Sequence, residues 1–255
     1  MNKIQNLSAV ILCGGRGSRL GSLTKIRPKP MINIKGQPLI WHIIKIYYKF
    51  GIKNFYLALG YKSFFIKNYF RKLENKKKNK ITILLSKKKN RLENDQININ
   101  LINTGHGTLT GGRLLRLKKY FRKNENFFLT YGDGISDINL TKLYKKHILS
   151  NKIATVTAVK PPARFGAIKF YRKKIVNFQE KIQTDNGWIN GGFFVCNYKI
   201  FDYIKNDNSI LEQYTLPFLV KKNQLTAYKH NGFWQCVDTI RDKEILEEKL
   251  KKNEL

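Results

Sequence analysis

The sequence predicts an α/β fold, in which a mostly parallel central sheet carries helices on both faces. Short apolar runs alternate with longer amphipathic stretches up to Lys160, a pattern typical of parallel sheets covered by helices. Glycine-rich turns follow two of these runs, after Cys13 and after Tyr131. The 255 residues, 42% of them apolar, are enough for one large core, so we expect a single domain over residues 1–255.

The first half of the chain supplies most of the expected elements. Ala9–Cys13 predicts a buried strand that runs into glycines, and Leu39–Phe50 predicts a helix that ends at Gly51. Further apolar runs predict strands over Asn54–Leu59, Ile81–Leu85 and Phe127–Tyr131, and helical spacing predicts helices over Phe64–Leu73 and Gly112–Phe121. Ser86–Asn100 is polar, starts with several lysines and shows no clean period, so we expect a loop there.

The second half is less regular. Leu140–Leu149 predicts a helix and the β-branched run Ile153–Val159 a strand. Phe170–Lys181 is expected to form a hairpin, Gly191–Asn197 a strand, and Tyr198–Asn206 the start of a helix. Ligands of such sheets bind beyond the carboxyl ends of the strands, so the site is expected just after Cys13 and Tyr131.

The charge and cysteine content restrict the class of protein. The net charge of +32 favours a polyanionic partner such as nucleic acid, but the lysines are dispersed and accompany many Asn, Ile, Tyr and Phe residues. A compositional bias explains that pattern without any partner, and we expect no nucleic-acid function. Three cysteines without a C-x-x-C pair, no signal peptide and no apolar run near ~18 residues predict a cytoplasmic protein with no membrane segment.

The first two motifs are suited to phosphate groups. Gly14-Gly15-Arg16-Gly17-Ser18-Arg19-Leu20 follows the first strand, where glycines allow the backbone to approach an anion and Arg19 offers a planar set of donors. A flexible turn with surface arginines is the plainer interpretation. Pro28-Lys29-Pro30 holds one lysine between two residues of fixed φ, or is an ordinary turn with an exposed lysine.

The last two motifs are suited to a metal ion. Asp133, flanked by glycines after an apolar strand, and Asp238, in an aromatic setting before Thr239, are carboxylates that a hard cation bridging to phosphate prefers. Each is also compatible with a simple turn or a helix cap. Taken together, the four motifs predict phosphoryl-type transfer, in which Arg19 and Lys29 offset the charge of a triphosphate and both aspartates hold Mg²⁺.

At this point the chain resembles the sugar-phosphate nucleotidyltransferases. Gly14–Leu20 followed by Pro28-Lys29-Pro30 is similar to their signature, and further short segments match in the right order over nearly the whole chain. These segments are Leu39-Ile40-Trp41-His42-Ile43, Gly60-Tyr61-Lys62, Asn103-Thr104-Gly105, Leu109-Thr110-Gly111-Gly112-Arg113-Leu114, Tyr131-Gly132-Asp133-Gly134, Arg164-Phe165-Gly166-Ala167, Phe178-Gln179-Glu180-Lys181, Ile189-Asn190-Gly191-Gly192-Phe193-Phe194-Val195, Gly232-Phe233-Trp234-Gln235 and Asp238-Thr239.

The resemblance implies a fold and an activity. It implies the three-layer, Rossmann-like α/β fold of nucleotide-diphospho-sugar transferases and the transfer of a cytidylyl group from CTP to α-D-glucose 1-phosphate, with Mg²⁺ as cofactor. CDP-glucose and pyrophosphate would be the products, and the pathway would make deoxysugars for surface polysaccharide such as O-antigen. A homo-oligomer such as a hexamer is also implied. A thymidylyl- or uridylyltransferase, and a sugar-nucleotide-binding regulatory protein without turnover, are the alternatives.

The resemblance also implies roles for the matching residues. Arg19, Lys29 and Asp133 would be catalytic, with Asp133 and Asp238 on the metal. The residues implied to bind nucleotide or sugar phosphate are Leu12, Cys13, Gly14, Gly15, Arg16, Gly17, Ser18, Arg19, Lys29, Thr108, Thr110, Gly111, Arg113, Tyr131, Gly132, Glu180, Lys181, Asn190 and Gly191. Lys181 has the charge to meet a dianionic sugar phosphate, and the amide of Asn190 can both donate to and accept from hydroxyls.

Overall fold

The described part of the chain contains one large mixed sheet. The structure is a computed structural model that describes residues 3–15, 26–74, 80–84, 96–161, 167–171, 174–179 and 187–251. Within these residues the sheet has eight strands in the order β13-β9-β12-β7-β1-β4-β6-β5. They are β1 (Ser8–Cys13), β4 (Asn54–Leu59), β5 (Lys80–Leu84), β6 (Gln96–Asn103), β7 (Asn126–Tyr131), β9 (Ala154–Val159), β12 (Ile189–Asn197) and β13 (Leu225–His230).

The strand directions confirm the predicted fold class. β1 runs parallel to both β4 and β7, β4 is parallel to β6, and β9 is parallel to β13. β12 is antiparallel to both of its neighbours, and the edge strand β5 is antiparallel to β6. The sheet is therefore mostly parallel, as the alternation of strands and helices predicts. The described helices include none that is both long and apolar enough to cross a membrane.

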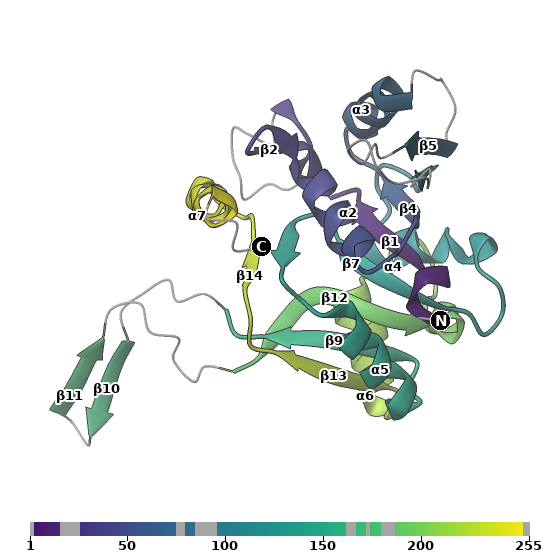
Figure 1. Ribbon diagram of the computed structural model, residues 1–255. Helices are drawn as coiled ribbons and strands as arrows, with labels where there is room; N and C mark the ends of the chain where they lie inside the picture. The colour runs from purple at the N-terminus through teal and green to yellow at the C-terminus, as the bar shows by residue number, and fades with distance from the viewer. Residues whose placement is uncertain are drawn as a thin grey trace.

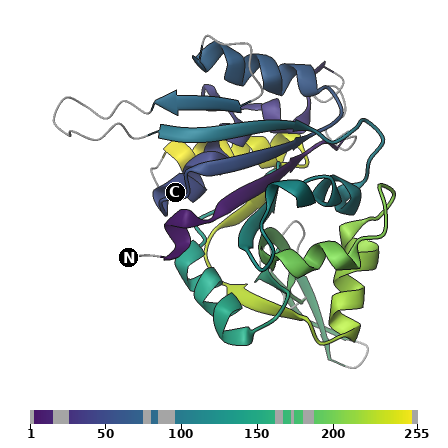
Figure 2. The same cartoon turned by 90° about the vertical axis from the view of Figure 1, so that its right-hand side faces the viewer.

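Helices cover both faces of the sheet and make it the middle of three layers (Figures 1 and 2). The alternating side chains of β1 show why: Ala9, Ile11 and Cys13 belong to one buried cluster, and Val10 and Leu12 belong to the other. The first cluster includes residues of α2 (Leu39–Lys49), α3 (Ser63–Glu74), α5 (Leu140–Ser150) and α7 (Ile240–Lys251). The second includes residues of α4 (Thr110–Leu115), α6 (Leu216–Lys221) and the short helices η5 (Tyr198–Tyr203) and η6 (Leu211–Thr215). A strand buried on both faces has a continuous apolar sequence, as SAVILC has.

Three small two-stranded sheets complete the description. β2 (Asn33–Ile34) pairs with β3 (Gln37–Pro38), and β8 (Gly134–Ser136) pairs with β14 (Trp234–Cys236). β10 (Ala167–Tyr171) and β11 (Lys174–Gln179) form the hairpin predicted for this region, and it stands apart from the main sheet in Figure 1. The remaining short helices are η1 (Lys3–Asn6), η3 (Lys29–Met31) and η4 (Lys118–Tyr120).

Two sequence-based expectations were wrong in part. Gln96–Asn103 is the strand β6, whereas a loop was expected as far as Asn100. Its Ile97, Ile99 and Leu101 are buried. The intervening asparagines donate hydrogen bonds to the neighbouring strand β4, as Asn98 Nδ2 does to Asn54 Oδ1 at 3.1 Å. The helix expected over Gly112–Phe121 is instead the short helix α4 followed by the single turn η4. The rest of the expected loop, residues 86–95, lies outside the described residues.

Candidate functional site

Two adjoining cavities lie at the carboxyl ends of β1 and β7, where the sequence predicts the site. One has a volume of about 620 Å³, and its lining includes Cys13, Gly14, Lys29 and Thr108. The other has a volume of about 350 Å³, and its lining includes Asn190, Gly191 and Trp234. Tyr131, Asp133 and Asp238 line both cavities. Two molecules bound side by side would therefore meet at these three side chains.

Lys29 bridges the two aspartates at this junction. Its Nζ donates to Asp133 Oδ2 at 2.8 Å and to Asp238 Oδ1 at 2.7 Å. The side chain of Lys29 is only 11% exposed, whereas those of Asp133 and Asp238 are 31% and 18% exposed. Burial pushes the pKa of Lys29 down, but the adjacent carboxylates outweigh it and raise the pKa above its ordinary value. The ammonium therefore stays charged, and it offsets a pair of carboxylates that would otherwise repel each other.

Lys29 is fixed by the backbone around it. The residues Lys29–Met31 form the helical turn η3, Pro28 stands at its N-cap, and Met31 N donates to Pro28 O at 2.8 Å. Gly132 lets this turn pack against β1 and β7, because a Cβ at that position would lie 2.8 Å from Pro30 Cγ and 3.1 Å from Leu12 O. The two prolines thus fix the lysine, as the sequence predicts, and the structure places it against the two aspartates rather than in an exposed turn.

Asp133 and Asp238 are brought together by the pairing of β8 with β14. Cys236 lies opposite Gly134, and Val237 N donates to Asp133 O at 2.9 Å. Directly after Asp238, Thr239 and Asp242 cap α7 reciprocally: Thr239 N donates to Asp242 Oδ2 at 2.8 Å, and Asp242 N donates to Thr239 Oγ1 at 3.1 Å. Asp238 therefore does precede a helix, as the plainer interpretation has it, and its carboxylate also faces Lys29.

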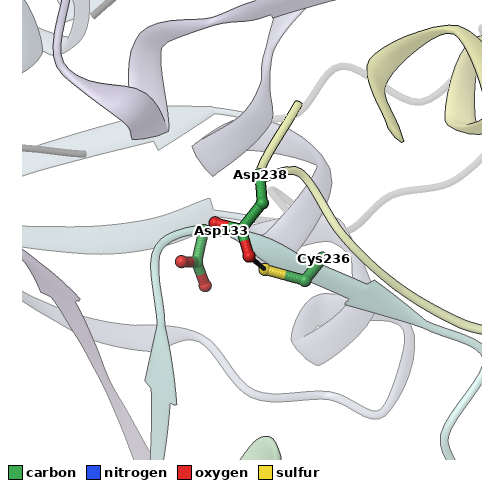
Figure 3. Close-up of side chains that lie close together, drawn as sticks. All are labelled: Asp133, Cys236 and Asp238. Carbon is green, nitrogen blue, oxygen red and sulfur yellow. Dashed lines mark hydrogen bonds between the residues drawn. The ribbon is translucent and has the colours of Figure 1, made fainter. Parts of the chain in front are cut away.

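These residues include a set of groups that can hold a metal ion. Atoms of Asp133, Cys236 and Asp238 lie within 4.8 Å of one another, and Figure 3 shows their side chains converging from two separate segments. Burial and then the charge of Asp133 raise the pKa of Cys236, so the thiol keeps its proton. A protonated, soft sulfur is a poor ligand for a hard cation, whereas two carboxylates suit one. The donor set therefore fits a hard divalent cation held by Asp133 and Asp238.

Arg113 holds together the loops that form the floor of the larger cavity. Its guanidinium donates to the carbonyl oxygens of Gly14, Leu59, Gly105 and His106 and to Thr104 Oγ1, at 2.7–3.3 Å. A Cβ at Gly14 or Gly60 would lie within 2.4 Å of this guanidinium. Gly14 is therefore a glycine because Arg113 approaches it, whereas no atom comes within 4 Å of a Cβ built on Gly15.

The segment from Thr108 to Arg113 has most of its polar groups committed to the protein. Gly111 N and Gly112 N donate to Ser209 O at 2.9 and 3.2 Å, and a Cβ at Gly111 would lie 2.8 Å from that oxygen. Thr110 Oγ1 donates to Glu212 Oε2 at 2.7 Å. The segment thus forms the wall of the larger cavity, and the glycines serve close packing against the loop before η6.

Asn190 and Gly191 lie on the wall of the smaller cavity. Trp234 Nε1 donates to Gly191 O at 2.7 Å and ties the start of β12 to β14. Asn190 Oδ1 accepts from Gly192 N at 2.8 Å, and Asn190 Nδ2 donates to Tyr131 Oη at 3.3 Å. Gly192 has a φ of +78°, and a Cβ there would lie 2.7 Å from the Tyr131 ring. The Gly191-Gly192 pair therefore allows the strand to turn against Tyr131.

The structure brings together most, though not all, of the predicted site residues. Leu12, Cys13, Gly14, Gly15, Lys29, Thr108, Thr110, Arg113, Tyr131, Gly132, Asp133, Asn190, Gly191 and Asp238 all line one or both cavities. Gly111 lies behind the wall. Arg16, Gly17, Ser18, Arg19, Glu180 and Lys181 lie outside the described residues, so their predicted roles stay predictions. Sequence reasoning missed Glu212, Trp234 and Cys236, of which Trp234 stood in a matched segment without being assigned a role.

Comparisons with known proteins agree with this geometry. The family model described as nucleotidyl transferase matches residues 8–250. The chain is 41% identical over 244 residues to the glucose-1-phosphate cytidylyltransferase of Salmonella typhi, covering 94% of this chain and 95% of that protein. It is 32% identical over 232 residues to the D-glycero-alpha-D-manno-heptose 1-phosphate guanylyltransferase of Aneurinibacillus thermoaerophilus, covering 89% of each.

The fold also recurs in solved structures. The crystal structure of HddC from Yersinia pseudotuberculosis superposes with a TM-score of 0.70, at 22% identity, covering 96% of this chain and 99% of that one. This likeness concerns the fold alone, and it agrees with the three-layer sheet described above. The match to the family model over most of the chain and the two relatives above establish more: this chain belongs to the nucleotidyl transferase family.

Proposed function

We propose that this chain transfers the cytidylyl group of CTP to α-D-glucose 1-phosphate, forming CDP-glucose and releasing pyrophosphate. The observation that carries the proposal is the pair of cavities that share Tyr131, Asp133 and Asp238. One cavity is large enough for a nucleotide, the other suits a sugar phosphate, and the charged groups lie where two phosphates would meet. The 41% identity to a glucose-1-phosphate cytidylyltransferase over nearly both chains supports the choice of substrates.

The chemistry requires no protein nucleophile. A phosphate oxygen of glucose 1-phosphate, already ionised at neutral pH, attacks the α-phosphorus of CTP as the bond from that phosphorus to the leaving pyrophosphate breaks. The protein positions the two phosphates in line and offsets the charge that develops on the leaving group. Lys29, fixed at the junction of the cavities, is placed for this task, and Arg19 is proposed to share it.

We propose Mg²⁺ as the cofactor, held by Asp133 and Asp238. When bound, it would neutralise phosphate charge at the reacting centre. The Lys29 ammonium now lies between both carboxylates, at 2.8 and 2.7 Å. Its positive charge offsets the repulsion between the two carboxylates, so that they lie close together before the cation arrives. Glu180 and Lys181 are proposed to bind the sugar phosphate.

A transferase with another base preference is the second candidate. The guanylyltransferase relative, at 32% identity over 89% of each chain, indicates that proteins similar to this one act on other nucleotides. The polar groups of Thr110, Gly111 and Arg113 form hydrogen bonds with other residues of the chain. Few donors in this segment therefore remain to distinguish one base from another. The alternative keeps the same sugar-phosphate chemistry and changes only the nucleotide.

The test is pyrophosphate release with glucose 1-phosphate, Mg²⁺ and each of CTP, UTP, dTTP and GTP. Release with CTP at a kcat/KM at least about tenfold above the other nucleotides is expected. Preference for another nucleotide would establish the second candidate. Tight binding of CTP and CDP-glucose without release in any mixture would instead favour a regulatory sugar-nucleotide-binding protein.

A further inference from the structure

Glu212 stands at the wall of the larger cavity, where two hydroxyl groups contact its carboxylate. It lies on η6, a turn of π-helix, and π-helical turns are frequent at functional sites. One carboxylate oxygen accepts a hydrogen bond from the Tyr131 hydroxyl, and the other accepts one from Thr110 Oγ1 at 2.7 Å. Within the part of the chain that the structure describes, no lysine, arginine or histidine forms an ion pair with it.

These contacts fix the direction of every hydrogen bond around the carboxylate. An ionised carboxylate only accepts, so both hydroxyls must direct their protons toward Glu212. Thr110 Oγ1 accepts in turn from Leu211 N at 2.9 Å, which agrees with its proton pointing the other way. A phenol is protonated at neutral pH, so Tyr131 has a proton to donate to Glu212.

The oxygen of Tyr131 is left as an acceptor in the smaller cavity. Asn190 is consistent with this polarity: its Oδ1 faces the Gly192 N–H at 2.8 Å, so its Nδ2 is the group that faces Tyr131 Oη, at 3.3 Å. Glu212 and Thr110 line the larger cavity, Asn190 lines the smaller one, and Tyr131 lines both. Two successive hydrogen bonds, from Asn190 to Tyr131 and from Tyr131 to Glu212, therefore connect the two cavities, and both are donated toward the carboxylate.

We propose that Glu212 is a positioning residue that holds Tyr131 Oη as a hydrogen-bond acceptor for a hydroxyl group of the sugar phosphate. The inference rests on the proposed function, because it assigns the smaller cavity to the sugar. Without the carboxylate, the Tyr131 proton is free to rotate into that cavity, where it would meet the hydrogen of the sugar hydroxyl instead of offering it a lone pair. The effect concerns the sugar substrate, although Glu212 itself lies on the other cavity's wall.

The experiment compares the intact wild-type protein with Glu212→Leu, Tyr131→Phe and the double variant. Leucine removes the acceptor, whereas the amide oxygen of glutamine would still accept from the Tyr131 hydroxyl. Pyrophosphate release gives KM for glucose 1-phosphate and for CTP separately. We expect each single change to raise KM for glucose 1-phosphate about tenfold, as the loss of one hydrogen bond does, with KM for CTP changed less than about threefold. The double variant should be no worse than the poorer single one, because both changes remove the same contact. Glu125→Leu, which removes a carboxylate that accepts from Arg122 N on the surface, is the matched control and should keep wild-type KM values.

Deoxyfluoro analogues of glucose 1-phosphate identify the sugar hydroxyl, since fluorine cannot donate a proton. For one of the analogues at positions 2, 3, 4 and 6, Glu212→Leu should cause no further loss relative to wild type, while the others keep the tenfold loss. Equal loss for all four analogues would overturn the inference and leave the proposed function intact. So would a Glu212→Leu variant whose KM rises equally for both substrates and whose urea midpoint falls. A wild-type protein that releases no pyrophosphate with any nucleotide would overturn the proposed function, and this inference with it.

Discussion

Replacing Lys29 by methionine separates two roles of the ammonium at the junction of the cavities. Methionine keeps an unbranched apolar chain of similar length, so the change removes mainly the charge that lies 2.8 Å from Asp133 and 2.7 Å from Asp238. Breaking a fully buried pair costs about 3–5 kcal/mol, and water reaches both carboxylates here, so we expect the free energy of unfolding to fall by about 2 kcal/mol. Turnover should fall about 10²- to 10³-fold, the loss found when a preorganised donor to a developing charge is removed.

Urea denaturation with and without Mg²⁺ tests this reasoning. Because a divalent cation can replace the missing ammonium between the carboxylates, saturating Mg²⁺ should recover most of the lost stability of Lys29→Met. It should not recover the turnover, since the phosphate contact of Lys29 stays absent. Lys118→Met is the matched control: it breaks an exposed ion pair with Asp202 at 3.1 Å and should change stability by less than about 1 kcal/mol. If the free energy of unfolding of Lys29→Met is the same with and without Mg²⁺, or if its turnover is near that of wild type, the proposed roles of Lys29 are wrong.

Three further changes test separate parts of the structure. Asp133→Asn should fold but lose about 100-fold or more of its turnover, because a carboxylate held for the cation becomes neutral, and near-normal pyrophosphate release would contradict this. Arg113→Lys should lower the urea midpoint and raise KM for CTP, because an ammonium cannot reach the five acceptors of the guanidinium, and an unchanged midpoint would show that the loops hold without it. His147 is a test of pH dependence, since burial lowers its pKa to about 4. Below the ordinary pKa of histidine, the unfolded chain binds a proton at His147 that the folded chain does not. The free energy of unfolding therefore falls as the pH drops from about 6.5 to about 4, and the loss at pH 5 is about 2 kcal/mol. His147→Gln should lack this loss when the free energy of unfolding is measured against pH.

Much of the site follows from sequence because its residues stand at the ends of buried strands. The apolar runs of β1 and β7 predict that the glycines after Cys13 and the Tyr131–Asp133 segment both lie at the carboxyl ends of strands. That the two strands are neighbours is seen only in the structure. Lys29 between two prolines could be predicted to be fixed, although not that it would bridge Asp133 and Asp238. That contact depends on the pairing of β8 with β14, which joins segments more than 90 residues apart.

Other features depend on packing that a sequence pattern does not display. The glycine loop that begins at Gly14 is suited to a phosphate, but Gly14 itself is also required by packing. The guanidinium of Arg113 occupies the space that a Cβ at Gly14 would need. Glu212 lies in a turn without a motif, and its role becomes visible only when η6 meets Tyr131 and Thr110. β6 was missed because its polar asparagines hide the alternation of Ile97, Ile99 and Leu101, and they are tolerated because they bond to neighbouring strands.

In the proposed function, nucleotide and sugar phosphate lie in the two cavities and meet at Asp133 and Asp238. A crystal structure of the protein with CDP-glucose and Mg²⁺ is the decisive measurement. We expect the cytidine in the cavity lined by Gly14 and Thr108, the glucose against Asn190 and Trp234, and the diphosphate with its cation at the two aspartates. A diphosphate bound away from both aspartates, or a glucose outside the smaller cavity, would contradict it.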